Sequence, residues 1–510
     1  MRHIHWDPTP PSRRTVATQS PRSRKTPGSL LRHIAAWTSR TVLAICCASV
    51  PSFAQKIGDP PEAKDMALVG YHDLQARSAY QPVIREQNGR WILYVGHHGG
   101  TQKVPKPLNP LTGAAEFNGT SILDVTDPAT PRYLMHLPGE EGLGEAGGAQ
   151  MVRVCSGKEL PHGDTAKFYL LRTFGNSWHE VWDVTDPARP TRVSRIGPLK
   201  GTHKNWWECD TGIAYLVSGV EGWRTRRMTQ IYDLSDPANP KFIRNFGLAG
   251  QQPGGAGDVP VDLHGPISTG LAGNRVYFGY GTNKDGIVQI VDRQKLLTGP
   301  AEPTPANLAY PEVGRLVLPP SVGAHTAFPL LKVNVAEFAS DAVGGSRDFV
   351  AVVNESLVNE CKEARQMLWI ADITTESRPF GVSTFTVPEA SGSFCSRGGR
   401  FGTHSSNESF TPIYYRRILF LAHFNAGVRA VDVRDPYHPR EIAYFIPPIT
   451  ASTDSRCIKV GGADRCKVAI QTNNVEVDDR GYVYIVDRAN TGLHILTLTG
   501  AARGIANLPH

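Results

Sequence analysis

The phrase that decides the fold reads Asp124-Val-Thr-Asp-Pro-Ala-Thr-Pro131. It returns further along the 510-residue chain as Asp183-Val-Thr-Asp-Pro-Ala-Arg-Pro190, Asp233-Leu-Ser-Asp-Pro-Ala-Asn-Pro240 and Asp432-Val-Arg-Asp-Pro-Tyr-His-Pro439, with degenerate copies around Asp292 and Asp372. The first Asp of successive copies recurs every 50 to 80 residues. A repeat of this length that contains several strands is typical of radial or stacked β architecture.

Each copy follows an apolar run, and a second apolar run precedes that one. Runs of this kind bounded by Gly and Asn predict strands and hairpins. The Asp-Pro pair then turns the chain into a fourth strand, because Pro presets φ and Asp bonds back to its own backbone. Seven pairs of second and third strands fit this template: 91–95 with 120–125, 168–172 with 180–184, 213–217 with 229–234, 275–279 with 287–292, 349–353 with 367–371, 418–422 with 428–433, and 482–486 with 493–498. The sequence therefore predicts an all-β fold, a seven-bladed β-propeller with four-stranded blades.

The two ends of the repeat region are complementary. The seventh unit lacks a fourth strand, and residues 65–70 form an isolated apolar run before the first unit. An N-terminal strand at about 65–70 can therefore complete the last blade. Closing the ring in this way removes an exposed sheet edge.

The first 54 residues have the layout of a secretory leader. A basic stretch runs to Arg40, a short apolar segment covers residues 41–50, and Ser52 and Ala54 provide small residues before a cut at Gln55. Ten apolar residues are too few to cross a bilayer, which needs about 20. We therefore expect a signal peptide and basic leader over 1–54, followed by a single propeller domain over 55–510. The mature protein is expected to be exported, either periplasmic or extracellular, with no transmembrane span once the leader is removed.

The basic charge of the chain belongs to this leader. Residues 1–54 contain eight of the 54 Lys and Arg residues and one of the 47 Asp and Glu residues, which leaves 46 of each. A neutral mature chain lacks the basic surface typical of nucleic-acid binding. Nucleic acid is therefore not an expected partner.

Six of the eight cysteines lie after the leader, and an even number in an exported chain indicates disulfides. Six cysteines allow 15 pairings, so most of the connectivity stays open. Cys457 and Cys466 flank one polar loop that contains glycine, and they are the predicted pair.

The strand pattern resembles that of the LVIVD-repeat proteins, a family of predicted bacterial and archaeal β-propellers. The matching stretches are Ile287-Val-Gln-Ile-Val-Asp292, Val428-Arg-Ala-Val-Asp-Val433 and Gly492-Leu-His-Ile-Leu-Thr-Leu498. The resemblance covers roughly residues 64–500. It implies the propeller fold but no activity, because the family is defined by its repeat.

Histidine recurs just before the first strand of the repeat. The five positions are His72, His203, His264, His325 and His404, while the second unit has Gln150 and the seventh has Asn473 or Asn474. Equivalent positions in a closed ring converge on its axis. The ends of second strands bring further candidates to the same face: His97, His98, His423 and Glu355, with Arg488 nearby.

Two interpretations of these histidines stay open. Neutral imidazoles around a channel mouth suit copper, zinc, iron or nickel, so a divalent or copper ion is the expected cofactor. Three or four would bind one metal ion, and the others would surround those ligands. Alternatively, each imidazole only bonds the backbone of a neighbouring blade, as a structural residue inherited with the repeat.

The sequence contains no nucleophile elbow, Walker motif or HExxH motif. It therefore favours a binding module that presents its His-rich face to an unknown protein, glycan or small molecule. The alternative is a metal-dependent, copper-type oxidoreductase, because the His-rich mouth is broadly similar to that of the selenium-binding protein and methanethiol oxidase group. This second resemblance holds at the level of the fold only.

Overall fold

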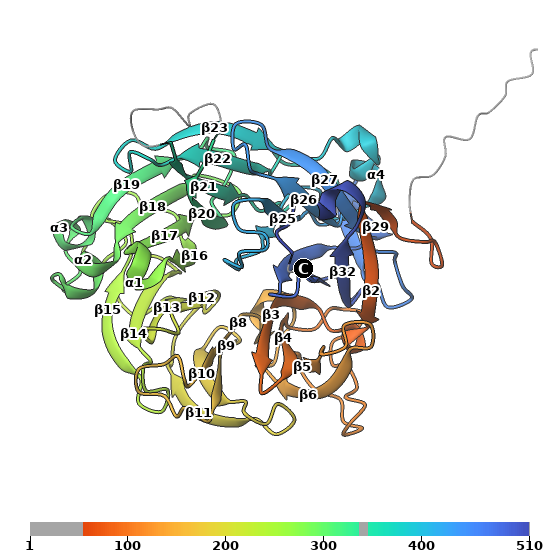
Figure 1. Ribbon diagram of the computed structural model, residues 1–510, viewed down its shortest axis with the longest axis horizontal. Coiled ribbons are helices and arrows are strands. Elements are labelled where there is room, and N and C mark those ends of the chain that lie inside the picture. Colours follow the sequence, from red (N-terminus) through yellow and green to blue (C-terminus); the bar gives the residue numbers. More distant parts are fainter. Residues whose placement is uncertain (1–54, 336–344, 509–510) are drawn as a thin grey trace, which may run out of the picture. The chain divides into compact units, whose positions relative to one another are not determined.

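The computed structural model describes residues 55–335 and 345–508. The leader predicted over residues 1–54 lies outside this part. Seven antiparallel sheets form a ring, as the sequence predicts (Figure 1). Blade 1 contains β3 (Ala79–Gln87), β4 (Arg90–His98), β5 (Gly119–Asp124) and β6 (Arg132–Pro138); blade 2 contains β8 (Val152–Ser156), β9 (Phe168–Phe174), β10 (Trp178–Asp183) and β11 (Thr191–Ile196); blade 3 contains β12 (Asn205–Trp207), β13 (Ile213–Ser218), β14 (Met228–Asp233) and β15 (Lys241–Phe246).

The ring continues with four more blades of the same order. Blade 4 contains β16 (Leu263–Ser268), β17 (Arg275–Tyr280), β18 (Ile287–Asp292) and β19 (Glu312–Val317); blade 5 contains β20 (Thr326–Val333), β21 (Arg347–Val353), β22 (Leu368–Asp372) and β23 (Phe380–Phe385); blade 6 contains β24 (Ser405–Ser406), β25 (Ile418–Ala422), β26 (Val428–Asp432) and β27 (Arg440–Ile446); blade 7 contains β30 (Thr472–Val477), β31 (Val483–Asp487), β32 (Leu493–Leu498) and β2 (Met66–His72).

Short elements decorate the blades. The strands outside the basic pattern are β1 (Glu62–Lys64), β7 (Gly148–Ala149), β28 (Ser455–Val460) and β29 (Ala463–Val468). The described helices are α1 (Gly270–Gly273), α2 (Arg293–Thr298), α3 (Pro305–Ala309), α4 (Phe394–Arg397) and α5 (Gly500–Arg503), with 3₁₀ turns η1 (Leu74–Ala76), η2 (Gly144–Ala146) and η4 (Glu389–Ser391). Within the described residues, no helix is both long and apolar enough to cross a membrane.

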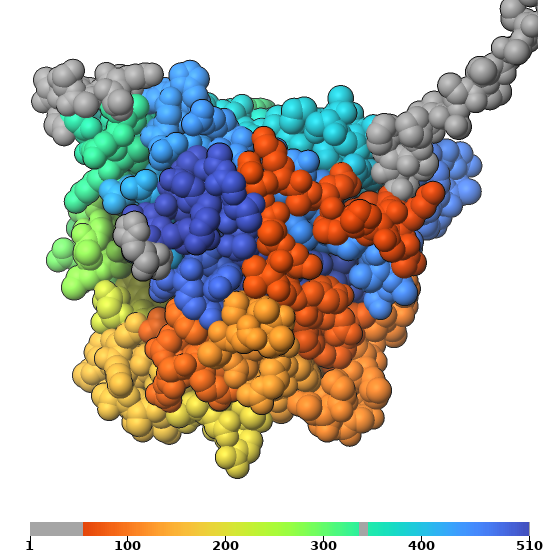
Figure 2. All heavy atoms as spheres, turned by 45° about the vertical axis from the view of Figure 1, so that its right-hand side comes forward, coloured from red at the N-terminus to blue at the C-terminus, as the bar shows by residue number. Residues whose placement is uncertain are grey.

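The N-terminal strand closes the ring as predicted. β2 pairs antiparallel with β32, from Met66 opposite Leu498 to His72 opposite Leu493. Figure 2 shows this N-terminal segment lying across the C-terminal residues. β1 also pairs with β27 at the outer edge of blade 6, a fifth strand that the sequence analysis did not predict. Two blades are therefore held together by one short N-terminal segment.

Both Asp residues of the repeated phrase fold the turn before the fourth strand. In blade 1, Asp124 Oδ1 accepts a hydrogen bond from the backbone N–H of Thr126 (3.0 Å), and Asp127 Oδ1 accepts one from Ala129 (3.0 Å). The copy that starts at Asp432 makes the same pair of bonds, at 3.1 Å and 3.0 Å. These side chains satisfy backbone donors that a tight turn leaves unpaired. The repeat therefore marks one turn, with one structure, on the face opposite the histidines.

The hydrophobic core lies between neighbouring blades. Leu93 and Val95 of β4 pack with Tyr484 and Val486 of β31 in one buried cluster, so blade 1 packs directly against blade 7. The apolar strands are buried on both faces because each blade is covered by two neighbours, which explains their nearly continuous hydrophobic runs.

Three disulfides reinforce loops of the ring. Cys457–Cys466 joins opposed residues of the β28–β29 hairpin, which confirms the predicted pair. Cys155–Cys209 links β8 to the loop after β12, so it joins blades 2 and 3. Cys361–Cys395 links the loop after β21 to α4.

Candidate functional site

Four of the five predicted histidines converge on the axis of the ring. His203, His264, His325 and His404 lie at or just before the first strands of blades 3 to 6, and each is at most 3% exposed. The Nε2 atoms of His203 and His264 are 2.9 Å apart. The ring centroids are 3.7 Å apart for His264 and His325, and 4.3 Å apart for His325 and His404. We call these residues the histidine arc.

The remaining three blades close the axis with other side chains. The amide nitrogen of Gln150 lies 2.8 Å from His203 Nδ1, and the carbonyl of Asn473 bonds His404 Nδ1. Blade 1 contributes Tyr80, whose ring lies 5.8 Å from that of His203 and 5.5 Å from that of His404. All seven blades therefore meet at the arc, although only four supply histidine.

Backbone carbonyls orient two imidazoles with Nε2 toward the axis. His264 Nδ1 lies 3.2 Å from the carbonyl oxygen of His325, and His404 Nδ1 bonds that of Asn473. A carbonyl only accepts hydrogen bonds, so each Nδ1 carries the proton and each Nε2 is an acceptor. His264 Nε2 accepts from the N–H of His203 Nε2, whose Nδ1 in turn accepts from the amide of Gln150. His325 Nδ1 bonds Thr326 Oγ1 at 2.9 Å, and its buried Nε2 has no hydrogen-bond partner in the described structure.

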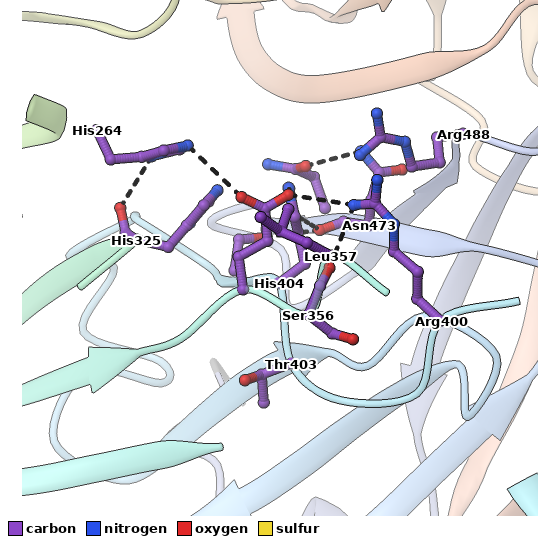
Figure 3. Close-up of polar contacts among 12 residues, drawn as sticks. His264, His325, Ser356, Leu357, Arg400, Thr403, His404, Asn473 and Arg488 are labelled. Atoms are coloured by element: carbon purple, nitrogen blue, oxygen red, sulfur yellow. Dashed lines mark hydrogen bonds and ion pairs between the residues drawn. The ribbon is translucent and has the colours of Figure 1, made fainter. Parts of the chain in front are cut away.

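Glu355 adds a carboxylate to the arc. Its oxygens lie 3.9 Å from His264 Nε2 and 3.7 Å from His404 Nε2 (Figure 3). One ligand atom each from His264, His325 and Glu355 lies within 4.8 Å of the others. Three or more nitrogen and oxygen donors at this spacing can converge on one metal ion after small movements.

The arc opens into a cavity of about 190 Å³. Basic side chains form much of its remaining wall, and Figure 3 shows Arg400 and Arg488 on the side opposite His264 and His325. Glu145 of η2 lies 3.1 Å from both His98 Nε2 and Arg488 Nη2. The lining residues are Tyr80, Glu145, His203, Arg226, Arg227, His264, Thr282, Glu355, Leu357, Arg400 and His404.

Burial decides the protonation of the arc. It lowers the pKa of all four imidazoles well below the usual value of 6.5, and for His264 the nearby Lys204 and Arg227 cations act in the same direction. Burial raises the pKa of Glu355, while Arg400 opposes this shift. The imidazoles are therefore neutral at neutral pH, which is the form that binds metal.

A buried charge cluster fills the axis next to the arc. Glu408 accepts hydrogen bonds from Lys204 Nζ (3.0 Å) and from Arg153. Its backbone N–H donates to Glu476 at 3.1 Å. Burial and the charge of Glu408 raise the pKa of Glu476 to about 7. These residues follow the histidines along the first strands, so they belong to the same axial stack.

His72 does not join the arc, and its predicted equivalence to the other four is wrong. It ends β2, the outermost strand of blade 7, where its Nδ1 accepts from the backbone N–H of Leu74 at 3.0 Å. Residues 65–72 belong to the last blade, so the first strand of blade 1 starts at Ala79 and brings Tyr80 to the axis.

The other predicted histidines lie at three different places. His98 packs against Tyr80 and faces Glu145, next to the cavity. His97 is turned away and bonds Ser121 Oγ at 2.8 Å inside blade 1. His423 is buried 5.0 Å from the ring of Phe401 and does not line the cavity. Among the candidates predicted from the ends of second strands, only Glu355 lines the cavity.

Sequence reasoning missed Tyr80, Glu145 and Arg227. Glu145 lies in the Gly-rich segment 142–148, which has no periodic pattern to indicate a site. Tyr80 could have been found, because assigning residues 65–70 to the last blade moves the start of blade 1 to about residue 79. Arg227 lies in a loop between two strands, where a single basic residue does not by itself indicate a binding site.

A larger cavity, about 800 Å³, lies at the other end of the first strands. It is lined by aromatic residues such as Trp206, Phe410 and Tyr415 and by loops between first and second strands. Two of its four carboxylates, Glu208 and Glu376, are already paired with Arg293 and Arg275. We favour the smaller cavity as the functional site, because the buried hydroxyl of Tyr80, which lines it, has no hydrogen-bond partner among the described residues.

Comparison with known proteins assigns neither a family nor a function to this chain. No protein-family model matches the chain, and no curated protein matches it. Solved structures of Sqt1 from Chaetomium thermophilum are similar: one has a TM-score of 0.45 at 9% identity, covering 85% of this chain and 99% of that one. Another, with Sqt1 bound to the N-terminus of ribosomal protein L10, has a TM-score of 0.44 at 10% identity, covering 84% and 99%. The propeller architecture rests on the strand pairing of this chain, and the resemblance to LVIVD-repeat and selenium-binding proteins stays a prediction.

Proposed function

We propose that this propeller is an exported binding protein that holds a transition metal ion at its channel mouth and captures a small ligand there. The ion would be bound by His264, His325 and Glu355, with His203 and His404 as further ligands. The propeller fold suits a binding module, and the three disulfides fit an oxidising compartment.

One observation carries the proposal. His325 Nε2 is fully buried, has no hydrogen-bond partner in the described structure, and lies near His264 and Glu355. Leaving a buried polar nitrogen unsatisfied costs about 1–3 kcal/mol, so a missing partner is expected there. The 2.9 Å contact between His203 Nε2 and His264 Nε2 is a hydrogen bond, which an ion bound by His264 Nε2 would have to replace.

The structural alternative predicts a partner for every imidazole within the protein. His264 and His404 do bond backbone carbonyls through Nδ1, as that alternative requires. However, such second-nitrogen bonds are also what orients metal-binding histidines. His325 Nε2 distinguishes the two interpretations, because it has no partner among the described residues, whereas His264 Nε2 accepts a hydrogen bond from His203.

Metal analysis tests the proposal. Residues 55–510 would be produced in an oxidising compartment and analysed by mass spectrometry for copper, zinc, iron and nickel. We expect about one ion per chain, lost in a His264→Asn, His325→Asn double variant. The exposed His162→Asn serves as the matched control and should keep its metal.

A folded wild-type protein that takes up no metal, even after dialysis against zinc or copper salts, would refute the metal site. So would a double variant that keeps the full metal content. Cobalt absorption of the wild-type protein gives a second measurement that does not depend on variant folding. Copper as the native ion would favour the oxidoreductase alternative over simple binding.

A further inference from the structure

Three arginines line the cavity beside the histidine arc, Arg226, Arg227 and Arg400, and Arg227 has no carboxylate partner among the described residues. Arg227 is 6% exposed, and its Nε donates to the carbonyl of Gly201 at 3.0 Å. In residues 55–335 and 345–508, no carboxylate pairs with it within 4.0 Å, the limit for an ion pair. Arg400 Nη1 donates to Glu355 Oε1 (3.3 Å) and to the carbonyl of Ser356 (3.2 Å). We call Arg227 and Arg400 the arginine wall.

Tyr80 adds an unpaired donor beside this wall. Its side chain is 1% exposed, lines the cavity, and its hydroxyl has no hydrogen-bond partner among the described residues. A tyrosine hydroxyl is protonated at neutral pH, so this group can donate a hydrogen bond. A buried tyrosine hydroxyl normally has a partner, and its absence here indicates a ligand atom.

The charges around the cavity leave an excess of positive charge. Glu145 and Glu355 are paired with Arg488 and Arg400, Arg226 is paired with Asp262, and Arg227 remains. A metal ion on the arc would add further positive charge. A buried cation without a counter-charge is costly, so an anion is the expected occupant.

The size of the cavity limits that anion. Its volume is about 190 Å³. This corresponds to roughly six water molecules at about 30 Å³ each. A phosphate ion or a short carboxylate fits this space, whereas a folded protein or a long glycan does not.

We propose that the cavity binds a small oxyanion, a carboxylate or phosphate group, between the arginine wall, the Tyr80 hydroxyl and the histidine arc. A planar guanidinium group can donate two parallel hydrogen bonds to two oxygens of a carboxylate or a phosphate. The proposal deepens the proposed function, because it names the ligand class of the same site, and it rests on that function for the contact with a metal ion.

Calorimetric titration with inorganic phosphate and, separately, acetate tests the inference and separates phosphate from carboxylate. Each anion would be titrated into metal-loaded and metal-free protein. We expect Arg227→Gln to weaken binding of the preferred anion by about tenfold or more, since it removes a hydrogen bond to a charged group. Tyr80→Phe should weaken it several-fold while removing only one oxygen. Arg224→Gln, whose guanidinium bonds the carbonyls of Gly250 and Gly257, is the matched control and should bind as the wild type does.

The outcomes separate the two proposals. Metal-loaded protein that binds neither anion at millimolar concentration overturns the anion site but leaves the metal site intact. The anion site is also overturned, and the metal site again left intact, if neither Arg227→Gln nor Tyr80→Phe changes anion binding. Protein that never takes up metal, yet binds an anion in a manner dependent on Arg227, refutes the proposed metal site and supports the anion site.

Discussion

Replacing Gly70 with alanine tests the closure of the ring by β2. A Cβ added at Gly70 would lie 2.0 Å from the carbonyl oxygen of Pro128 and 3.3 Å from the carbonyl carbon of Ala129. Both residues belong to the Asp-Pro turn of blade 1, whose backbone is fixed by the bonds of Asp124 and Asp127. The extra methyl group must therefore push β2 away from blade 1 or distort this turn.

Overpacking of this kind costs about 1–3 kcal/mol, so the free energy of unfolding should fall by that amount in Gly70→Ala. Gly381→Ala is the matched control, because Gly381 also lies on an outer strand but the nearest atom to an added Cβ is 4.0 Å away, in Trp369. Alanine should stabilise that site by about 0.4–1 kcal/mol by restricting the unfolded chain.

Urea denaturation followed by tryptophan fluorescence, with the disulfides intact, measures both effects. Proteolysis of the N-terminal segment provides a second readout, since a displaced β2 should be cleaved faster. Equal denaturation midpoints and equal cleavage rates for the two variants would show that β2 does not pack against the turn of blade 1, and the closure would then be wrong.

Three further predictions concern stability. Replacing both cysteines of Cys155–Cys209 by serine should lower the free energy of unfolding by about 4 kcal/mol, and replacing those of Cys457–Cys466 should lower it by about 3 kcal/mol. The first loss is larger because that disulfide closes the longer loop. Urea denaturation measures both losses, and a larger loss for Cys457–Cys466 would contradict this argument. Lys204→Met should destabilise the protein by about 3–5 kcal/mol, because it leaves Glu408 without one of its two cations. The double variant Lys204→Met, Glu408→Gln should recover part of this stability. A double variant no more stable than Lys204→Met would refute the coupling between the two side chains. Burial lowers the pKa of His423 to about 3, so between that value and 6.5 the unfolded chain binds the proton and the folded protein does not. Stability should therefore fall as the pH drops below 6.5, by about 2 kcal/mol at pH 5 from this residue. Urea denaturation at pH 7 and pH 5 should show that the free energy of unfolding falls less between these pH values in His423→Asn than in the wild type or in the exposed control His438→Asn. Equal decreases in all three proteins would show that His423 does not cause the pH dependence.

Local sequence was sufficient to predict the fold. The Asp-Pro phrase forms its turn through hydrogen bonds between residues close in sequence, such as Asp127 and Ala129. Each copy therefore predicts the same turn wherever it occurs in the chain. The lone strand at 65–70 and the missing strand at the C-terminus were also visible in the order of the elements. The pair Cys457–Cys466 was predictable for a similar reason, because nine residues separate the two cysteines.

The site depended on the three-dimensional arrangement. A recurring histidine predicted convergence correctly for His203, His264, His325 and His404, since equivalent positions of a closed ring face one axis. His72 matched the same local pattern but belongs to an outer strand, and only the pairing of β2 with β32 separates these two cases. Tyr80, Glu145 and Arg227 come from three different loops and strands with no common spacing.

The sequence by itself therefore determined the seven-bladed ring and four of the histidines that face its axis, because those depend on short-range turns and strand periodicity. Only the tertiary structure decided which imidazole nitrogens face the cavity, and which charges surround them. These features depend on contacts between residues more than 50 positions apart, such as His404 with Asn473 and Glu145 with Arg488, and such contacts leave no local pattern in the chain.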